Sequence, residues 1–445
     1  MPIHDLRTFI AAARTAGEVN EIPRSVSPVH ELGNVLKACE RIDKAVYFHK
    51  VEGSEFPVVG GLLSSQRWVG RALECPSEEV GDRMAIATEK PIKPELQKSA
   101  AASQEVVIEK PDLTKLPIPT HSPLDAGAFI TAGVVISRDH ETGQHNLSYN
   151  RMQIYGSDRS GISMNIWRHM KAFYDKGEKT GRNLPFCVAI GPDPALMIAA
   201  ACRYDGDEYE IAGALRGAPV PVVRAQTCDV MVPAFAEFII EGEVIAGERH
   251  LEGPMAEFTG HYSARDEKNV ARITRITHRK QPIFQTMNGG GYEHVYIGNT
   301  ITREPLLARF IRHITKKLRA VHLPPYAAGF TAIISLDDPA PGEVRNVAIA
   351  ALAAHVNIKT VIVVGKDVDV YDPADVMWAL GTRVRWHEDL LPIPGAHGNE
   401  LDPTSDEHGV QCKVIIDATL PAASTKSPIK VAYPPINLAR YLDTK

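Results

Sequence analysis

Apolar residues recur with different spacings along the chain, and the changes of spacing divide it into three regions. In the first hundred residues, helical spacing follows Asp5, a residue type whose side chain caps helices, and apolar runs at 45–51 and 57–63 predict strands. The first helical face is formed by Leu6, Phe9, Ile10 and Ala13. This pattern predicts an α/β region, closed by an extended linker at 109–123 that holds four prolines.

The middle of the chain is rich in strand patterns. A turn at 140–144 separates the runs 128–137 and 145–156, which predicts a hairpin. Further strands are expected at 160–166, 185–191, 220–226 and 235–247, with helices near 167–176, 193–202 and 207–215. We therefore expect a β-rich barrel or sandwich with inserted helices.

The last third alternates between unbroken apolar runs and helical patterns. Strands are expected at 331–336, 359–365 and 413–419, with helices at 343–356 and 373–384 between them. Apolar strands separated by helices predict a buried, mostly parallel sheet. Residues 385–412, rich in Pro, Gly, Asp and His, are expected to form a long functional loop.

Composition and charge narrow the classes of function. The chain has 445 residues, which predicts two or three domains. Its net charge of −5 gives no argument for nucleic-acid binding, and no apolar run is long enough to span a membrane. The first residues lack the features of a signal peptide, and the six cysteines form no CxxC pair. We therefore expect a cytoplasmic protein with reduced thiols.

The stretch HLEGPMAEFTGHY at 250–262 places Glu252 and Glu257 around Gly253 and Pro254. Residues five apart do not share a face of a regular helix or strand, whereas a turn brings them together. Two carboxylates in one confined site repel each other, so one stays protonated near neutral pH and can donate a proton. A solvated loop is the alternative, but the apolar and aromatic neighbours favour a partly buried turn.

Arg151 is the candidate partner of this pair, because a planar guanidinium binds carboxylates through two donors. Asn146 on the same strand, His169 at a helix start and Glu208 would together form a mixed oxygen and nitrogen set. Such a set suits Mn²⁺ or Mg²⁺ bound beside a phosphate. Taken singly, each of these residues is typical of an ordinary exposed position.

Two glycine clusters add further candidates. The run MNGGGYEH at 287–294 predicts a flexible loop or one that another backbone approaches closely. The run VVGKDVD at 363–369 places Lys366 at the carboxyl end of a parallel strand, where phosphates bind. His294 and Arg303 are candidates for binding a second polar or anionic group of a substrate, the alternatives being a loop histidine and a surface arginine.

The segments NLSYNRMQ, WRHM, DEYEIAGALRG, FIIEGEV, LEGPMAEFTGHY and VVGKDVD together resemble those of the UbiD-type decarboxylases, in order and in separation, from about residue 110 to 425. These are reversible, non-oxidative carboxy-lyases that use prenylated FMN. The resemblance implies an N-terminal α/β domain at 1–110 and a central flavin-binding split β-barrel at 111–305. It also implies a C-terminal α/β domain at 306–445. The last residues of this domain, 435–445, are expected to form an arm that packs on a partner subunit, the alternative being a frayed tail.

The family's site residues fall on matching positions. The resemblance implies that Arg151 holds the substrate carboxylate, Glu252 bridges to that arginine, and Glu257 donates the proton. The metal-binding positions are Asn146, His169 and Glu208. The cofactor contacts implied are Asn146, Tyr149, Asn150, Arg151, Ser163, Met164, Asn165, Arg168, His169, Glu208 and Lys366.

The activity implied is decarboxylation of an aromatic, heteroaromatic or α,β-unsaturated acid through a covalent adduct with prenylated FMN. Mn²⁺ or Mg²⁺, with K⁺ as a further ion, would accompany the cofactor. The partners implied are the acid, CO₂, a flavin prenyltransferase that supplies the cofactor, and further copies of the chain in a homodimer or homohexamer. If His294 and Arg303 contact substrate, a furan or other heteroaromatic dicarboxylate is favoured. A flavin-independent metal hydrolase and a non-enzymatic flavin carrier are the alternatives.

Overall fold

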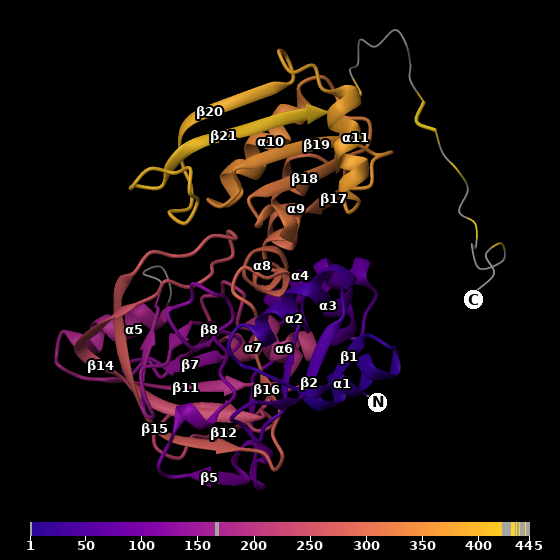
Figure 1. The fold of residues 1–445 in the computed structure, drawn as a ribbon. Helices are drawn as coiled ribbons and strands as arrows, with labels where there is room; N and C mark the ends of the chain where they lie inside the picture. Colours follow the sequence, from indigo (N-terminus) through magenta and orange to yellow (C-terminus); the bar gives the residue numbers. More distant parts are fainter. Residues whose placement is uncertain are drawn as a thin grey trace.

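The computed structural model of the protein describes residues 2–164, 169–420, 429–431, 433, 436 and 441. The N-terminal and central parts of the chain form one large body, and the C-terminal part forms a second lobe beyond helices α8 and α9 (Figure 1). Within these described ranges, no helix combines the length and apolarity that crossing a membrane requires. The predicted arm at 435–445 lies outside the described residues, apart from 436 and 441.

The N-terminal region begins with helix α1 (Leu6–Thr15), whose N-cap is Asp5, as its sequence predicts. The predicted face of this helix is buried. Its sheet has the order β1 (Val19–Val26), β2 (Ala45–Val51), β3 (Val58–Gly60) and β16 (Phe284–Gln285). Helices α2 (Glu31–Cys39), α3 (Gln66–Ala72) and α4 (Val80–Glu89) complete the region. Because β16 comes from much later in the chain, this sheet ties the N-terminal region to the central one.

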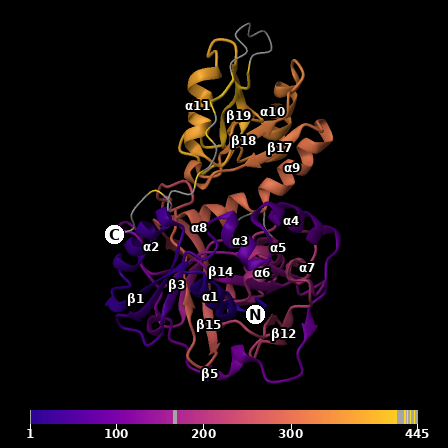
Figure 2. The same ribbon diagram turned by 90° about the vertical axis from the view of Figure 1, so that its right-hand side faces the viewer.

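The central region is built on a seven-stranded antiparallel sheet. Its order is β10 (Arg159–Ile162), β15 (Asp266–His278), β14 (Phe238–Glu252), β11 (Leu184–Ile190), β7 (Val134–Arg138) and β8 (His145–Tyr149), with β5 (Val106–Ile108) paired to β15. Helices α5 (His169–Glu178), α6 (Pro194–Ala199) and α7 (Glu208–Arg216) are inserted between strands (Figure 2). The predicted hairpin is the β7–β8 pair, whereas β15 was not predicted.

One apolar core joins the N-terminal region to this sheet. It contains Phe9 and Trp68 from α1 and α3 together with Val134 and Ile239 from β7 and β14. Because these side chains are buried against one another, the two regions pack as a single body. The hydrophobic stabilisation of the N-terminal helices therefore also stabilises the central sheet.

The C-terminal lobe has its own core and a five-stranded sheet in the order β17 (Leu318–His322), β18 (Thr331–Leu336), β19 (Thr360–Gly365), β21 (Val410–Ala418) and β20 (Leu390–His397). The three central strands are parallel, as predicted, and both edge strands are antiparallel. Helices α10 (Glu343–Ala354) and α11 (Pro373–Arg383) connect the strands. The prediction that 385–412 is a loop is wrong over β20, because Pro392 and Pro394 mask an edge strand, where proline is tolerated.

The connection between the two bodies is anchored by Glu293. This residue lies in α8 (Tyr292–Val295), which continues through a π-helical turn into α9 (Arg303–Ile314). Its carboxylate accepts hydrogen bonds from the backbone N–H groups of Gly61 at 2.8 Å, Leu62 at 3.0 Å and Leu63 at 3.0 Å. Burial raises the pKa of Glu293 to about 7, although the three N–H donors oppose this rise.

This raised pKa predicts a pH-dependent stability. The folded protein binds the Glu293 proton more tightly than the unfolded chain does, so the stabilisation is complete below about pH 4.5 and is lost as the pH rises through about 7. We expect Glu293→Gln to flatten that slope, which amounts to no more than about 3 kcal/mol. Denaturant unfolding across the pH range measures it, with Glu52→Gln at an exposed position as the control. An unchanged slope in Glu293→Gln would contradict the assignment.

Candidate active site

The structure brings Arg151 between the two predicted glutamates. Arg151 lies in the short connection between β8, which ends at Tyr149, and β9 (Met152–Gln153). Its Nε donates to Glu252 Oε1 at 2.7 Å, and its Nη1 donates to Glu257 Oε1. The exposed fractions of the side chains are 16% for Arg151, 0% for Glu252 and 13% for Glu257, so this is a mostly buried network.

Burial and charge oppose each other in this network. Burial raises the pKa of Glu252, and the Arg151 guanidinium opposes that rise. Burial disfavours the charged form of Arg151, but the two carboxylates outweigh it and raise the pKa of the guanidinium. The arginine therefore stays charged. One cation facing two carboxylates in a poorly solvated site favours retention of one proton on the pair, which is the state that proton donation needs.

The turn that carries the second glutamate is held by groups that the sequence analysis missed. Strand β14 ends at Glu252, and Gly253 adopts a φ of +86°. Gln153 Oε1 accepts from the N–H of Gly253, and Asp125 Oδ1 accepts from the N–H of Ala256, both at 2.9 Å. Gln153 lies two residues after Arg151, and in an extended chain such residues point to the same side, so its place beside the site could have been predicted. No local pattern marks Asp125.

The glycine loop at 288–291 packs directly on this turn. A Cβ atom on Gly289 would collide with the carbonyl oxygen of Ala256, and a Cβ on Gly290, whose φ is +67°, would lie 2.9 Å from the carbonyl oxygen of Glu257. These glycines therefore allow the backbone of the loop to approach that of the glutamate turn closely. This is the second of the two predictions for the loop, a close approach by another backbone.

Two of the three candidate metal ligands lie close together. Glu208 occupies the first turn of α7, and its Oε2 accepts from the N–H of Leu147 at 2.8 Å. The side chain of Asn146, the residue before Leu147, is buried. His169 begins α5, which packs against β8. No cluster of three or more His, Cys, Asp or Glu side chains suited to a metal is found in the described ranges, but the predicted set contains only two such residues and an amide.

Strand β8 presents a buried polar face beside these residues. Asn146 Nδ2 donates to Ser148 Oγ at 3.1 Å, Ser148 Oγ donates to Asn150 Oδ1 at 2.7 Å, and Asn150 Nδ2 donates to the carbonyl oxygen of Ser163 at 2.9 Å. Because these side chains are hydrogen-bonded to one another, the row is stable in the interior, and its amide and hydroxyl groups are of the type that binds a polar ligand. Tyr149 points the other way, with its hydroxyl donating to the carbonyl oxygen of Met197 at 3.1 Å.

The remaining predicted residues are scattered. Met164 is buried in an apolar core, and Asn165 and Arg168 lie outside the described residues. Lys366 is exposed after β19 and is ion-paired with Asp338 at 2.7 Å and Asp337 at 3.0 Å. Arg303 donates to Asn299 Oδ1 within its own helical segment.

His294 lies close to the carboxylate network. Its ring meets that of Phe258 edge-on, with centroids 6.3 Å apart. Burial lowers the pKa of His294, and the charge of Glu257 opposes this shift. His294 therefore presents a largely neutral imidazole beside the proposed proton donor.

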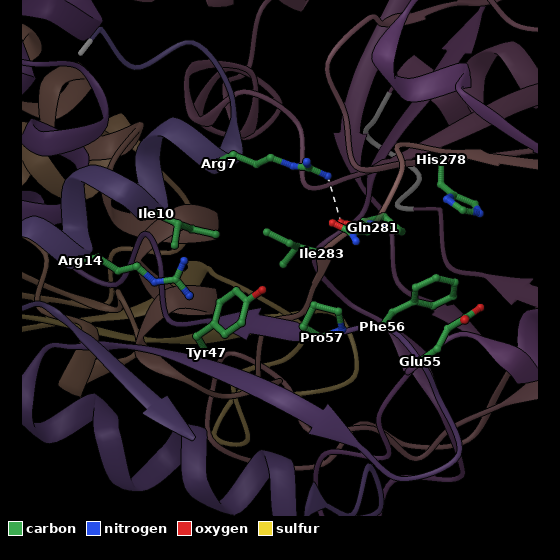
Figure 3. Close-up of a pocket in the computed structure, with 11 residues that line it drawn as sticks. Arg7, Ile10, Arg14, Tyr47, Glu55, Phe56, Pro57, His278, Gln281 and Ile283 are labelled. Carbon is green, nitrogen blue, oxygen red and sulfur yellow. Dashed lines mark hydrogen bonds between the residues drawn. The ribbon is translucent and has the colours of Figure 1, made fainter. Parts of the chain in front are cut away.

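A separate cavity of about 580 Å³ lies between α1, β2 and the segments around Phe56 and Ile283 (Figure 3). None of the predicted site residues lines it. Its two arginines, Arg7 and Arg14, are already ion-paired with Glu237 and Glu21. With its cationic groups neutralised in this way, the cavity offers no distinct recognition chemistry, and we assign no ligand to it.

Comparison with known proteins identifies the family and the fold. Residues 10–87, 95–292 and 296–418 match the N-terminal, Rift-related and C-terminal domains described for 3-octaprenyl-4-hydroxybenzoate carboxy-lyase. The anhydromevalonate phosphate decarboxylase of Methanothermobacter thermautotrophicus is 33% identical over 90% of this chain and 94% of its own. A phenolic acid decarboxylase of Bacillus subtilis is 32% identical over 95% of this chain and 94% of its own.

Solved structures of UbiD-class enzymes have the same fold as this chain. The UbiD-class enzyme HmfF from Pelotomaculum thermopropionicum, in complex with FMN, has a TM-score of 0.94 and 35% identity, covering 99% of this chain and 100% of its own. An evolved dimeric form of HmfF in complex with prFMN has a TM-score of 0.90 and 33% identity over the same shares.

The fold and the site therefore define a carboxy-lyase whose structural relatives bind a flavin. The chain belongs to the UbiD family. This membership replaces the alternatives of a flavin-independent metal hydrolase and a non-enzymatic flavin carrier.

The contact between the glycine loop and the glutamate turn can be tested directly. We expect Gly289→Ala to push the Ala256 carbonyl away and displace Glu257 from Arg151, lowering decarboxylase activity at least about tenfold while the protein stays folded. The measurements are turnover and circular dichroism. Gly81→Ala, in α4 where an added Cβ meets nothing within 4 Å, is the control and should keep full activity. Full activity in Gly289→Ala would show that the turn does not depend on this contact.

Proposed function

We propose that the protein catalyses the reversible, non-oxidative decarboxylation of an aromatic, heteroaromatic or α,β-unsaturated carboxylic acid. The observation that carries this proposal is the single Arg151 guanidinium that binds Glu252 and Glu257 together in a mostly buried site. Such a group can hold a substrate carboxylate and keep a proton donor beside the carbon that loses it.

Each residue of the network has a separate task. Arg151 binds the substrate carboxylate through the guanidinium N–H groups that the two glutamates do not use. Glu257, at the edge of the network, donates the proton that takes the place of CO₂ on the substrate carbon. Glu252, whose side chain is fully buried, holds Arg151 in position through the hydrogen bond from its Nε.

Prenylated FMN fits the polar face of β8. The buried chain of Asn146, Ser148 and Asn150 has no role in apolar packing and offers amide and hydroxyl groups to a polar ligand. When bound, prenylated FMN supplies the covalent electron sink that decarboxylation at an sp² carbon needs, because no side chain can take up those electrons. Arg151 follows this strand by two residues and is held there by the two glutamates.

The metal proposal rests on the same face. We infer that Asn146, His169 and Glu208 hold Mn²⁺ or Mg²⁺ at the cofactor phosphate, with K⁺ as a further ion. The support is the hard donor set and the position of the Glu208 carboxylate against the backbone beside Asn146. Lys366 is proposed as a phosphate contact, for which it would exchange its ion pairs with Asp337 and Asp338.

A heteroaromatic dicarboxylate, such as a furan dicarboxylate, is the narrower substrate proposal. Its support is the place of His294 and Phe258 beside Glu257, where an aromatic ring would stack and a second polar group would reach the imidazole. Arg303 would have to leave Asn299 to join this contact. A flavin prenyltransferase supplies the cofactor, and copies of the chain assemble into a homodimer or homohexamer in the cytoplasm.

Removing the proton donor tests the mechanism. We expect Glu257→Gln to bind prenylated FMN with an unchanged visible spectrum and to lose decarboxylation by a factor of about 10² to 10⁴, because the amide cannot donate a carboxylic proton. The assay uses a panel of furan, benzene and propenoic carboxylic acids, with protein produced alongside a flavin prenyltransferase. Glu267→Gln, at an exposed position of β15, is the matched control. Turnover near the wild-type rate in Glu257→Gln would show that Glu257 is not the proton donor.

Metal binding is tested separately. We expect Glu208→Gln to weaken Mn²⁺ binding at least about tenfold in the presence of FMN, because the amide removes the only carboxylate of the proposed set. Equilibrium dialysis with Mn²⁺ measures this. Glu210→Gln, on the same helix and half-buried, should leave Mn²⁺ binding unchanged. Equal Mn²⁺ affinity in wild type and Glu208→Gln would rule out this ligand set.

A further inference from the structure

Two oxygen atoms beside the glutamate network are buried without a partner. Glu252 Oε2, on the side of the carboxylate away from Arg151, is buried and has no hydrogen-bond partner among the described residues. The hydroxyl of Tyr155 is in the same condition. Each unpaired buried polar atom carries a desolvation cost, so two of them in one place require an explanation.

The two atoms lie around the same point. A Cβ atom on Gly161, in β10, would collide with the Tyr155 hydroxyl and would lie 3.4 Å from Glu252 Oε2. The absence of a side chain at Gly161 therefore leaves room for the Tyr155 hydroxyl near the Glu252 carboxylate. The ring of Tyr155 is supported by that of His250, with centroids 4.1 Å apart, two residues before Glu252 on β14.

We propose that Tyr155 is a positioning residue of the proton-delivery network. A rotation of its ring would bring its hydroxyl, unpaired in this structure, onto the equally unpaired Oε2 of Glu252, and a hydrogen bond donated there would keep Glu252 ionised. This inference rests on the proposed function. A phenol suits the task because it stays protonated: burial, with the charge of Glu252 added, raises the pKa of Tyr155 to about 12. Neither Tyr155 nor Gly161 is assigned a role by the family's motif residues.

The charges around Glu252 set the direction of the effect. The groups that face its carboxylate or its strand are Arg151, Glu257, Lys268, Asp266, His250 and Tyr155. Arg151 and Lys268 favour the ionised form, and Glu257 opposes it. A donor on Oε2 adds to the first set, because a hydrogen bond to a carboxylate stabilises its charge and lowers its pKa. Loss of that donor must therefore raise the pH at which Glu252 takes up a proton.

The experiment compares Tyr155→Phe and Gly161→Ala with wild type. Tyr155→Phe removes only the hydroxyl, whereas Gly161→Ala displaces it from the other side. pH-difference infrared spectra of the protein without cofactor follow the carboxylic-acid bands, and Glu252→Gln identifies the band of Glu252. Tyr47→Phe, in the remote cavity and also mostly buried, is the control. The same variants are then assayed for the pH dependence of kcat/KM on the panel of acids.

We expect both variants to move the Glu252 band, and the acid limb of kcat/KM, upward by about one pH unit, with Tyr47→Phe unchanged. An unmoved Glu252 band in Tyr155→Phe overturns the proposal, as does a uniform loss of kcat/KM without a shift of the limb, which would indicate a purely structural role. If the band moves but wild type decarboxylates none of the acids, the proposed function fails while the Tyr155–Glu252 contact stands.

Discussion

The guanidinium of Arg151, enclosed between two carboxylates in a mostly buried position, is the interaction on which the site depends. Taking charges out of water is costly, and a buried ion pair is held only when its remaining donors and acceptors are satisfied. If one partner were removed, the charge left behind would cost about 3–5 kcal/mol. The three residues therefore act as a unit.

The scaffold keeps that unit in place by drawing its parts from distant segments. Arg151 follows an edge strand of the central sheet, and Glu252 ends the long strand β14 that lies three places away in the same sheet. The turn that carries Glu257 is fixed from one side by Asp125 and from the other by the glycine loop. Because that loop leads into α8, which Glu293 ties to the N-terminal region, the position of Glu257 depends on both parts of the large body.

Much of this arrangement was open to prediction, and the rest has a physical reason for being hidden. Capping and periodicity located α1, and motif order located Arg151, Glu252 and Glu257, because local patterns and the family's spacing carry that information. β20 was missed because its prolines suppress a strand signal that an edge position tolerates. Asp125 and Tyr155 were missed because they act through neighbours that are distant in sequence, which no local pattern encodes.

Under the proposed function, proton delivery and substrate recognition come from different elements of the fold. The network of Arg151 and the glutamates belongs to the central sheet and the turn after β14, whereas His294 belongs to α8, between the two bodies. A substitution in α8 that leaves the preceding glycine loop in place would therefore alter what lies beside Phe258 without moving the ion pairs of Arg151. The matched relatives are named for acids as different as an anhydromevalonate phosphate and a phenolic acid, so proteins with this fold differ in the carbon skeleton that they decarboxylate.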